Sequence, residues 1–112
     1  MRDSHRFAET GKLLAQDDQI RHVAELAAAA LDSLDESTVS RLASDDAARE
    51  LLFQQLWDEV VEPLPHDAGS TFDMWRMSME GVVIDHLIVL WASKSGYDWR
   101  SRIRGLLAMQ PA

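Results

Sequence analysis

Residues 72 to 94 read FDMWRMSMEGVVIDHLIVLWASK and carry most of the bulky apolar side chains of the protein. A one-sided amphipathic helix would place its apolar residues at i, i+3, i+4 and i+7. Here the apolar residues from 82 to 91 point in every direction around a helix, which is typical of a helix buried among several neighbours. The charged residues in the stretch exclude a membrane span, which needs roughly 20 mostly apolar residues. We therefore predict a central helix over about residues 71–94.

The flanking residues are expected to mark the ends of this helix. Ser70 or Thr71 can accept a hydrogen bond from the first free backbone N–H groups. Gly96 can adopt the left-handed conformation that closes a helix. The β-branched run of residues 82–89 would also suit a buried strand, but no second strand-like segment exists to pair with it.

Further helices are predicted from apolar periodicity and capping residues, over residues 18–34, 35–43, 45–62 and 98–110. Residues 1–16 are expected to form either a short helix or a mobile arm. The helix over 45–62 combines an apolar face with an acidic one, and the loop PLPHDAG follows it. The sequence thus predicts an all-α fold, a single domain over residues 1–112. In it a compact bundle of four to five helices surrounds the central helix.

Composition narrows the function classes. The chain of 112 residues has no cysteine, which excludes disulfides, thiolate metal sites and thiol catalysis. Its first residues, MRDSHRFAETGK, contain no apolar segment of the kind found in secretory signals. We therefore expect a cytoplasmic protein, and the Ala- and Asp-rich usage leads us to expect a bacterial or phage source.

Charge is distributed unevenly along the chain. The net charge is −8, and residues 32–62 hold nine acidic residues against two arginines. Residues 94–104 hold four basic residues against one acidic residue. Such an acidic chain disfavours general binding to nucleic acid phosphates and favours fast association with a basic protein. The alternative is that the acidic and basic regions pair within the molecule or across a dimer.

Catalytic and metal-binding motifs are absent from the sequence. It has no Gly-rich phosphate loop, no GxSxG and no HExxH. His22 and Glu25 have the reverse of the Glu-x-x-His spacing that helical di-metal sites use. We expect no metal, no cofactor and no enzymatic activity.

Asp85 and His86 are the most interesting titratable pair, because both lie on the most apolar helix. Adjacent helical residues point about 100° apart, so each needs its own partner. For Asp85 we expect Arg76 or an arginine of residues 100–104. The favoured interpretation is structural, with His86 as a core histidine and Asp85 in an internal salt bridge. A titratable site is the alternative, and it would require a cavity at the pair.

The leading hypothesis is a small acidic domain that binds, and thereby inhibits, a basic protein. The chain is similar to immunity proteins of bacterial nuclease toxins and to phage-encoded inhibitors, which are also small, acidic and cytosolic. This resemblance is one of character, without a shared motif. The predicted partner-binding residues are Gln54, Asp58, Glu59, Glu62, His66 and Asp67.

Two other functions compete with this hypothesis. The first is a homodimeric structural or adaptor subunit, since four tryptophans and five methionines leave room for an apolar interface. The second is a nucleic-acid-associated regulator that uses the basic C-terminal helix, whose aromatic residues and arginines could stack on bases.

Overall fold

The computed structural model describes residues 2–94 and 96–109, and within these all regular structure is helical, with no strand. The elements are α1 (Arg2–Gln16), α2 (Asp18–Asp32), α3 (Glu36–Leu42), α4 (Asp46–Leu56), the π-helical η1 (Trp57–Val61), α5 (Thr71–Ala92) and α6 (Gly96–Ala108). The all-α prediction is confirmed, and this part of the chain contains six α-helices. None of these helices is long and apolar enough to span a bilayer.

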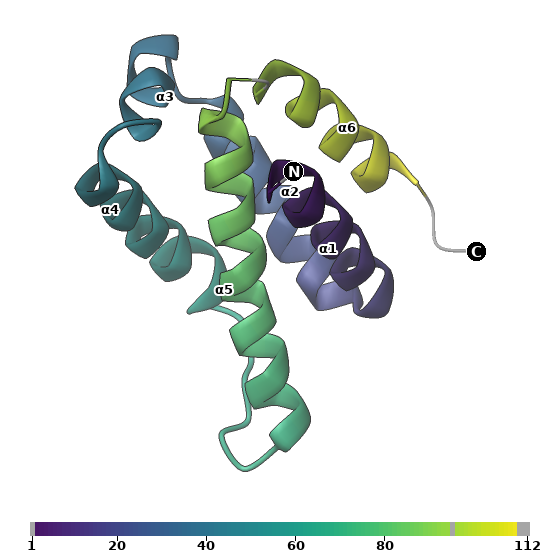
Figure 1. Cartoon of the computed structure of the whole chain (residues 1–112). Coiled ribbons are helices and arrows are strands. Elements are labelled where there is room, and N and C mark those ends of the chain that lie inside the picture. The colour runs from purple at the N-terminus through teal and green to yellow at the C-terminus, as the bar shows by residue number, and fades with distance from the viewer. Residues whose placement is uncertain (1, 95, 110–112) are drawn as a thin grey trace.

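Helix α5 occupies the centre of the fold and contacts every other helix. Figure 1 shows α4 on one side of it and α1, α2 and α6 on the other, while the N-terminal end of α5 projects beyond the bundle. Its core side chains Val83, Ile84, Leu87 and Leu90 are inaccessible to solvent. The apolar run predicted to be surrounded on several sides is therefore surrounded, as a helix buried among neighbours must be.

The two ends of α5 differ in how well the sequence predicted them. The Ser70 hydroxyl accepts a hydrogen bond from the Asp73 backbone N–H at 3.2 Å, and the helix begins at Thr71. The expected left-handed stop at Gly96 is wrong, because no glycine in the described residues has a positive φ. Gly96 instead begins α6, where a Cβ atom would collide with the carbonyl oxygen of Trp91. Glycine is needed there for the close approach of α6 to the end of α5.

Small side chains bring α2 close to α5. Ala24, Ala27 and Ala28 are buried in the core, and α2 makes the most extensive contact with α5. The indole N–H of Trp91 on α5 donates to the Asp32 carboxylate at the end of α2, at 3.1 Å. Buried tryptophans usually find such a partner for the ring nitrogen.

The N-terminal segment, expected as a short helix or a mobile arm, forms α1 and packs against the bundle. Leu13 and Leu14 are part of the hydrophobic core. Asp17 follows α1 and caps α2, since its carboxylate accepts from the backbone N–H groups of Gln19 and Ile20 at 2.9 and 3.0 Å. The same carboxylate binds Arg76 of α5 at 3.0 Å, so a single side chain links the start of α2 to the central helix.

Candidate functional site

A groove of about 790 Å³ lies between α4–η1 and α5. The first wall is made by Asp46, Arg49, Glu50, Phe53, Gln54 and Trp57. The second wall is made by Ser78, Gly81, Val82, Asp85 and His86. Binding sites are typically concave surfaces with an apolar lining and a few polar groups, and this groove has that composition.

The floor of the groove is aromatic. The rings of Phe53 and Trp57 stack with centroids 6.2 Å apart and an interplanar angle of 24°. Both residues are only partly buried, although they pack on the core. Gly81 permits this arrangement, because a Cβ atom there would lie 3.2 Å from the Trp57 ring and would push it outward.

A wide helical turn follows the aromatic pair. The Glu62 N–H donates to the Trp57 carbonyl, five residues back, at 3.0 Å, so α4 continues as the π-helix η1. In this turn the adjacent residues Val60 and Val61 are both buried, while Asp58 and Glu59 stay exposed. The sequence predicted an uninterrupted α-helix here and missed the π turn, a feature frequent at functional sites.

The rim of the groove is acidic. Glu50 and Asp85 face it from opposite walls, and both are exposed. Arg49, the cation in the first wall, is already bound to the Asp46 carboxylate and to the Leu42 carbonyl. Within residues 2–94 and 96–109, the carboxylates of Glu50, Asp58, Glu59, Glu62 and Asp85 form no ion pair.

Acidic residues elsewhere do have internal partners. On α6, Arg104 pairs with Asp32 at 2.8 Å and Arg100 with Glu36 at 3.5 Å. The third α6 arginine, Arg102, lies over the Trp99 ring, 5.0 Å from its centroid. The basic C-terminal helix therefore pairs with residues 32–36 and not with residues 45–62. The alternative that the acidic and basic regions pair within the molecule therefore holds for residues 32–36, but not for residues 45–62 within the described part of the chain.

The predicted partner-binding residues of α4 and η1 lie on or beside the groove. Gln54 lines it, and its side-chain amide donates to the Asp58 carboxylate at 3.0 Å. Glu59 and Glu62 are exposed on η1 and at its end, outside the groove lining. These four polar side chains are accessible to a partner, as the prediction requires.

The two predicted loop residues are placed differently. Asp67 is exposed, but its carboxylate accepts from the Gly69 N–H at 2.9 Å and its own N–H donates to Asp73. The His66 side chain is only 10% exposed and its Nε2 lies 3.3 Å from a Glu80 carboxylate oxygen. His66 therefore points into the fold, and little of it is available to a partner.

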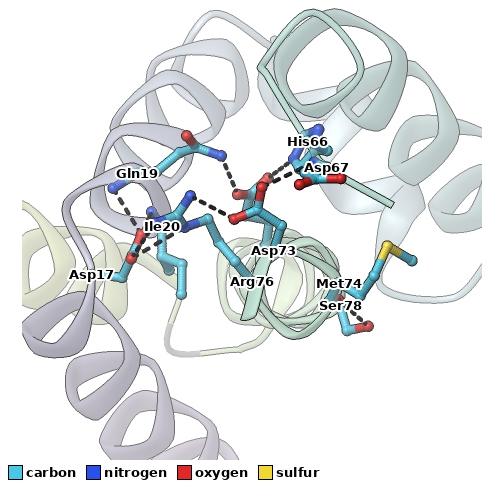
Figure 2. Close-up of polar contacts among 10 residues, drawn as sticks. Asp17, Gln19, Ile20, His66, Asp67, Asp73, Met74, Arg76 and Ser78 are labelled. Carbon is cyan, nitrogen blue, oxygen red and sulfur yellow. Dashed lines mark hydrogen bonds and ion pairs between the residues drawn. The ribbon is translucent and has the colours of Figure 1, made fainter. Parts of the chain in front are cut away.

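The sequence did not single out Glu80, which is fully buried in the middle of α5. Its carboxylate accepts a hydrogen bond from the Gln19 side-chain amide at 2.9 Å and lies against His66. Figure 2 shows the side chains of Gln19 and His66 directed towards this part of α5, and Arg76 of α5 bound to Asp17. We call Gln19, His66 and Glu80 the Glu80 cluster. It ties α2 and the loop after η1 to α5, the helix that forms the second wall of the groove.

Asp85 and His86 do not form the expected buried pair. Asp85 is exposed and makes no ion pair within the described residues, so the predicted salt bridge to an arginine is wrong. His86 is half-buried, and its Nδ1 lies 3.4 Å from the Thr10 hydroxyl. Thr10 donates its only hydroxyl proton to the Arg6 carbonyl at 2.8 Å, so Nδ1 of His86 is the donor in this contact.

The environment of His86 predicts a loss of stability in mild acid. Burial lowers the pKa of His86 below its ordinary 6.5, with smaller opposing effects from Glu9 and Asp85, which raise it. In mild acid the histidine of the unfolded chain therefore binds a proton that His86 in the folded chain does not. The contribution of His86 to the free energy of unfolding is complete above about pH 6.5 and is lost as the pH falls towards the folded-state pKa. When the pH is lowered below 6.5, the free energy of urea unfolding should therefore fall less for a His86→Gln variant than for the wild-type protein. Equal losses would assign the pH dependence to other groups.

Two further observations complete the site. Among the residues that the structure describes, no group of three or more His, Cys, Asp or Glu side chains could hold a metal ion. Comparison of the chain with family models, with curated proteins and with solved structures gives no match.

Proposed function

We propose that this protein is a binding domain that docks a basic protein through the acidic surface of α4–η1 and the groove beside it. One observation carries the proposal. Within the described residues, the exposed carboxylates of Glu50, Asp58, Glu59 and Glu62 along α4–η1, and of Asp85 across the groove, form no ion pair, whereas Asp32 and Glu36 are paired with arginines of α6. Unpaired like charges repel one another, and a partner of opposite charge relieves this repulsion.

An inhibitory role follows from the same chemistry. Proteins that bind or cleave nucleic acids present basic surfaces to phosphates. An acidic domain seated on such a surface blocks access to it, and complementary fields accelerate the encounter. The proposal thus includes an inhibitor or immunity protein for a basic enzyme such as a nuclease.

The test is charge reversal on the exposed surface. Asp58→Lys and Glu62→Lys should slow association with a basic partner at low salt, because steering acts over a screening length of about 30 Å at 0.01 M but only about 10 Å at 0.1 M. The partner is first captured by the wild-type protein, and association of the two purified proteins is then followed by stopped flow at both salt concentrations. Dissociation should change less, since desolvated contacts are poorly screened.

A matched control separates steering from net charge. Glu25→Lys changes the net charge equally but lies on α2, away from the groove. It should affect association less than the reversals at Asp58 and Glu62. Thermal melts should be unchanged by the reversals at Asp58 and Glu62, since these side chains are exposed and form no ion pair within the described residues, whereas Glu25→Lys loses a surface ion pair with Arg21 and should melt at a slightly lower temperature. The proposal would be contradicted if the Asp58→Lys and Glu62→Lys variants associated with the partner at unchanged rates but melted at lower temperatures.

A homodimeric subunit is the second candidate, and one surface favours it. Phe72 and Met74 are 52% and 45% exposed at the projecting end of α5 in Figure 1. The Phe72 ring packs on Trp75 with centroids 5.6 Å apart, which forms a small apolar surface. Light scattering over a range of concentrations distinguishes the two candidates. A stable dimer would support the homodimeric subunit, and a monomer would support the acidic binding domain.

A further inference from the structure

We infer that the groove between α4 and α5 receives an arginine side chain of the partner, held on the Phe53–Trp57 pair between Glu50 and Asp85. This inference rests on the proposed function and narrows it, because it specifies which basic residue the partner presents and where it is bound. The groove is thus the anchoring point, while the outer carboxylates of η1 supply long-range attraction.

The aromatic floor is the first argument. Phe53 and Trp57 are stacked and only partly buried, and both rings are held in place by packing against α5 at Gly81. A cation over the face of an aromatic ring is attracted by the ring quadrupole, most strongly for tryptophan. Arginine is the residue that best combines this stacking with hydrogen bonds in the plane of its guanidinium group.

The walls are the second argument. Glu50 and Asp85 present carboxylates from α4 and α5, and neither forms an ion pair within the described residues. Arg49 cannot neutralise them at its present position, because Asp46 and the Leu42 carbonyl already hold its guanidinium group. A guanidinium group entering the groove would meet carboxylates at its edge and aromatic rings at its face.

The molecule already contains one arrangement of this kind with its cation in place. The Arg76 guanidinium carbon lies 4.6 Å from the centre of the Phe72 ring. The same group binds Asp17 at 3.0 Å and Asp73 at 3.5 Å. The groove repeats this combination of aromatic face and two carboxylates, but no cation among the described residues binds its carboxylates Glu50 and Asp85, and we infer that a partner supplies one.

The experiment uses the whole protein and three short peptides, acetyl-Leu-Xaa-Leu-amide with arginine, citrulline or lysine at the centre. Citrulline has nearly the shape of arginine but no charge. Titrations are followed by ¹⁵N NMR, with the Trp57 indole N–H and the Gly81 amide as reporters of the groove. The arginine peptide should shift both signals. The citrulline peptide should bind about tenfold more weakly, because it lacks charge-assisted hydrogen bonds, and the lysine peptide should lie between them.

Paired variants locate the effect. The double variant Glu50→Gln/Asp85→Asn should weaken binding of the arginine peptide to the level of the citrulline peptide. The control Glu25→Gln/Asp98→Asn removes the same charge from α2 and α6 and should leave binding unchanged. Thermal melts verify that both double variants are folded. Glu25→Gln removes the 3.8 Å ion pair with Arg21, whereas the other three carboxylates are exposed and form no ion pair within the described residues.

Failure of the arginine anchor can be distinguished from failure of the proposed function. Equal binding of the arginine and citrulline peptides, shifts confined to η1, or no shift at millimolar peptide would each overturn the arginine anchor. Salt-dependent association with a basic protein would survive any of these results, and the proposed function with it. Loss of that association as well would remove both.

Discussion

Replacing Leu87 by alanine should lower the free energy of unfolding by about 2–5 kcal/mol, as for other large-to-small substitutions in well-packed cores. Leu87 has no accessible surface and lies on α5, which contacts every other helix. Its removal would leave a cavity between several elements, which cannot all move inward to fill it. The change is measured by urea unfolding at neutral pH.

Leu51→Ala is the matched control for this prediction. Leu51 is 63% exposed on α4, so the same substitution removes little buried surface there. The urea dependence of the unfolding free energy should stay the same in both variants, because that slope reports the surface exposed on unfolding. A loss below about 1 kcal/mol for Leu87→Ala would place this side chain at the surface and α5 away from the centre.

The central helix was predictable because its signal is local. A run of apolar residues that spreads over most of a helix requires burial on several sides, and Ser70 supplies a side-chain cap. The end of α5 was predicted incorrectly because glycine has two uses. At Gly96 it provides close approach to the Trp91 carbonyl and not a left-handed turn, and only the packing of α6 decides between these.

The π turn at η1 left no such signal in the sequence. The sequence from Trp57 to Val61 is compatible with an ordinary α-helix, and its apolar residues fit the face that begins at Ala48. Burial of both Val60 and Val61 accompanies the wider turn. Such burial depends on neighbouring helices that are distant in sequence, so local patterns cannot reveal it.

The candidate site was predicted in part. The acidic face of residues 45–62 and the exposure of Gln54 and Asp58 on it follow from helical periodicity. Which acidic residues lack partners could not be predicted, because Asp32 and Glu36 are paired through α6, more than sixty residues away in sequence. The same limit explains the error at Asp85. An all-apolar helix was expected to bury it, but α5 leaves one side open to the groove.

Glu80 was overlooked for a related reason. A single glutamate in a run of apolar residues was interpreted only as a charge that interrupts the run. Its burial depends on Gln19 and His66, which reach it from α2 and from the loop after η1. A sequence signal existed nonetheless, since buried acidic groups require hydrogen-bond donors and His66 lies only fourteen residues away.

Replacing Glu80 by alanine should lower the free energy of unfolding by about 2–5 kcal/mol, because a cavity is created and the Gln19 amide loses its acceptor. Glu80→Gln should cost less. Its side chain has nearly the same shape, its oxygen can accept from Gln19, and its amide can form a hydrogen bond with a ring nitrogen of His66. The measurement is again urea unfolding, with Glu59→Ala as a control at an exposed glutamate of η1, which should leave the unfolding midpoint unchanged.

A double-mutant cycle with His66→Ala determines whether the Glu80 cluster acts as a unit. Residues in one hydrogen-bond network typically show interaction energies of about 0.5–3 kcal/mol. We expect His66→Ala to be strongly destabilising in the wild-type background, where it leaves a buried carboxylate with a single donor, and much less so when Glu80 is alanine. Because the cluster ties the loop after η1 to α5, His66→Ala should also release this loop from α5. Additive effects of the two substitutions would show that His66 and Glu80 stabilise the protein independently.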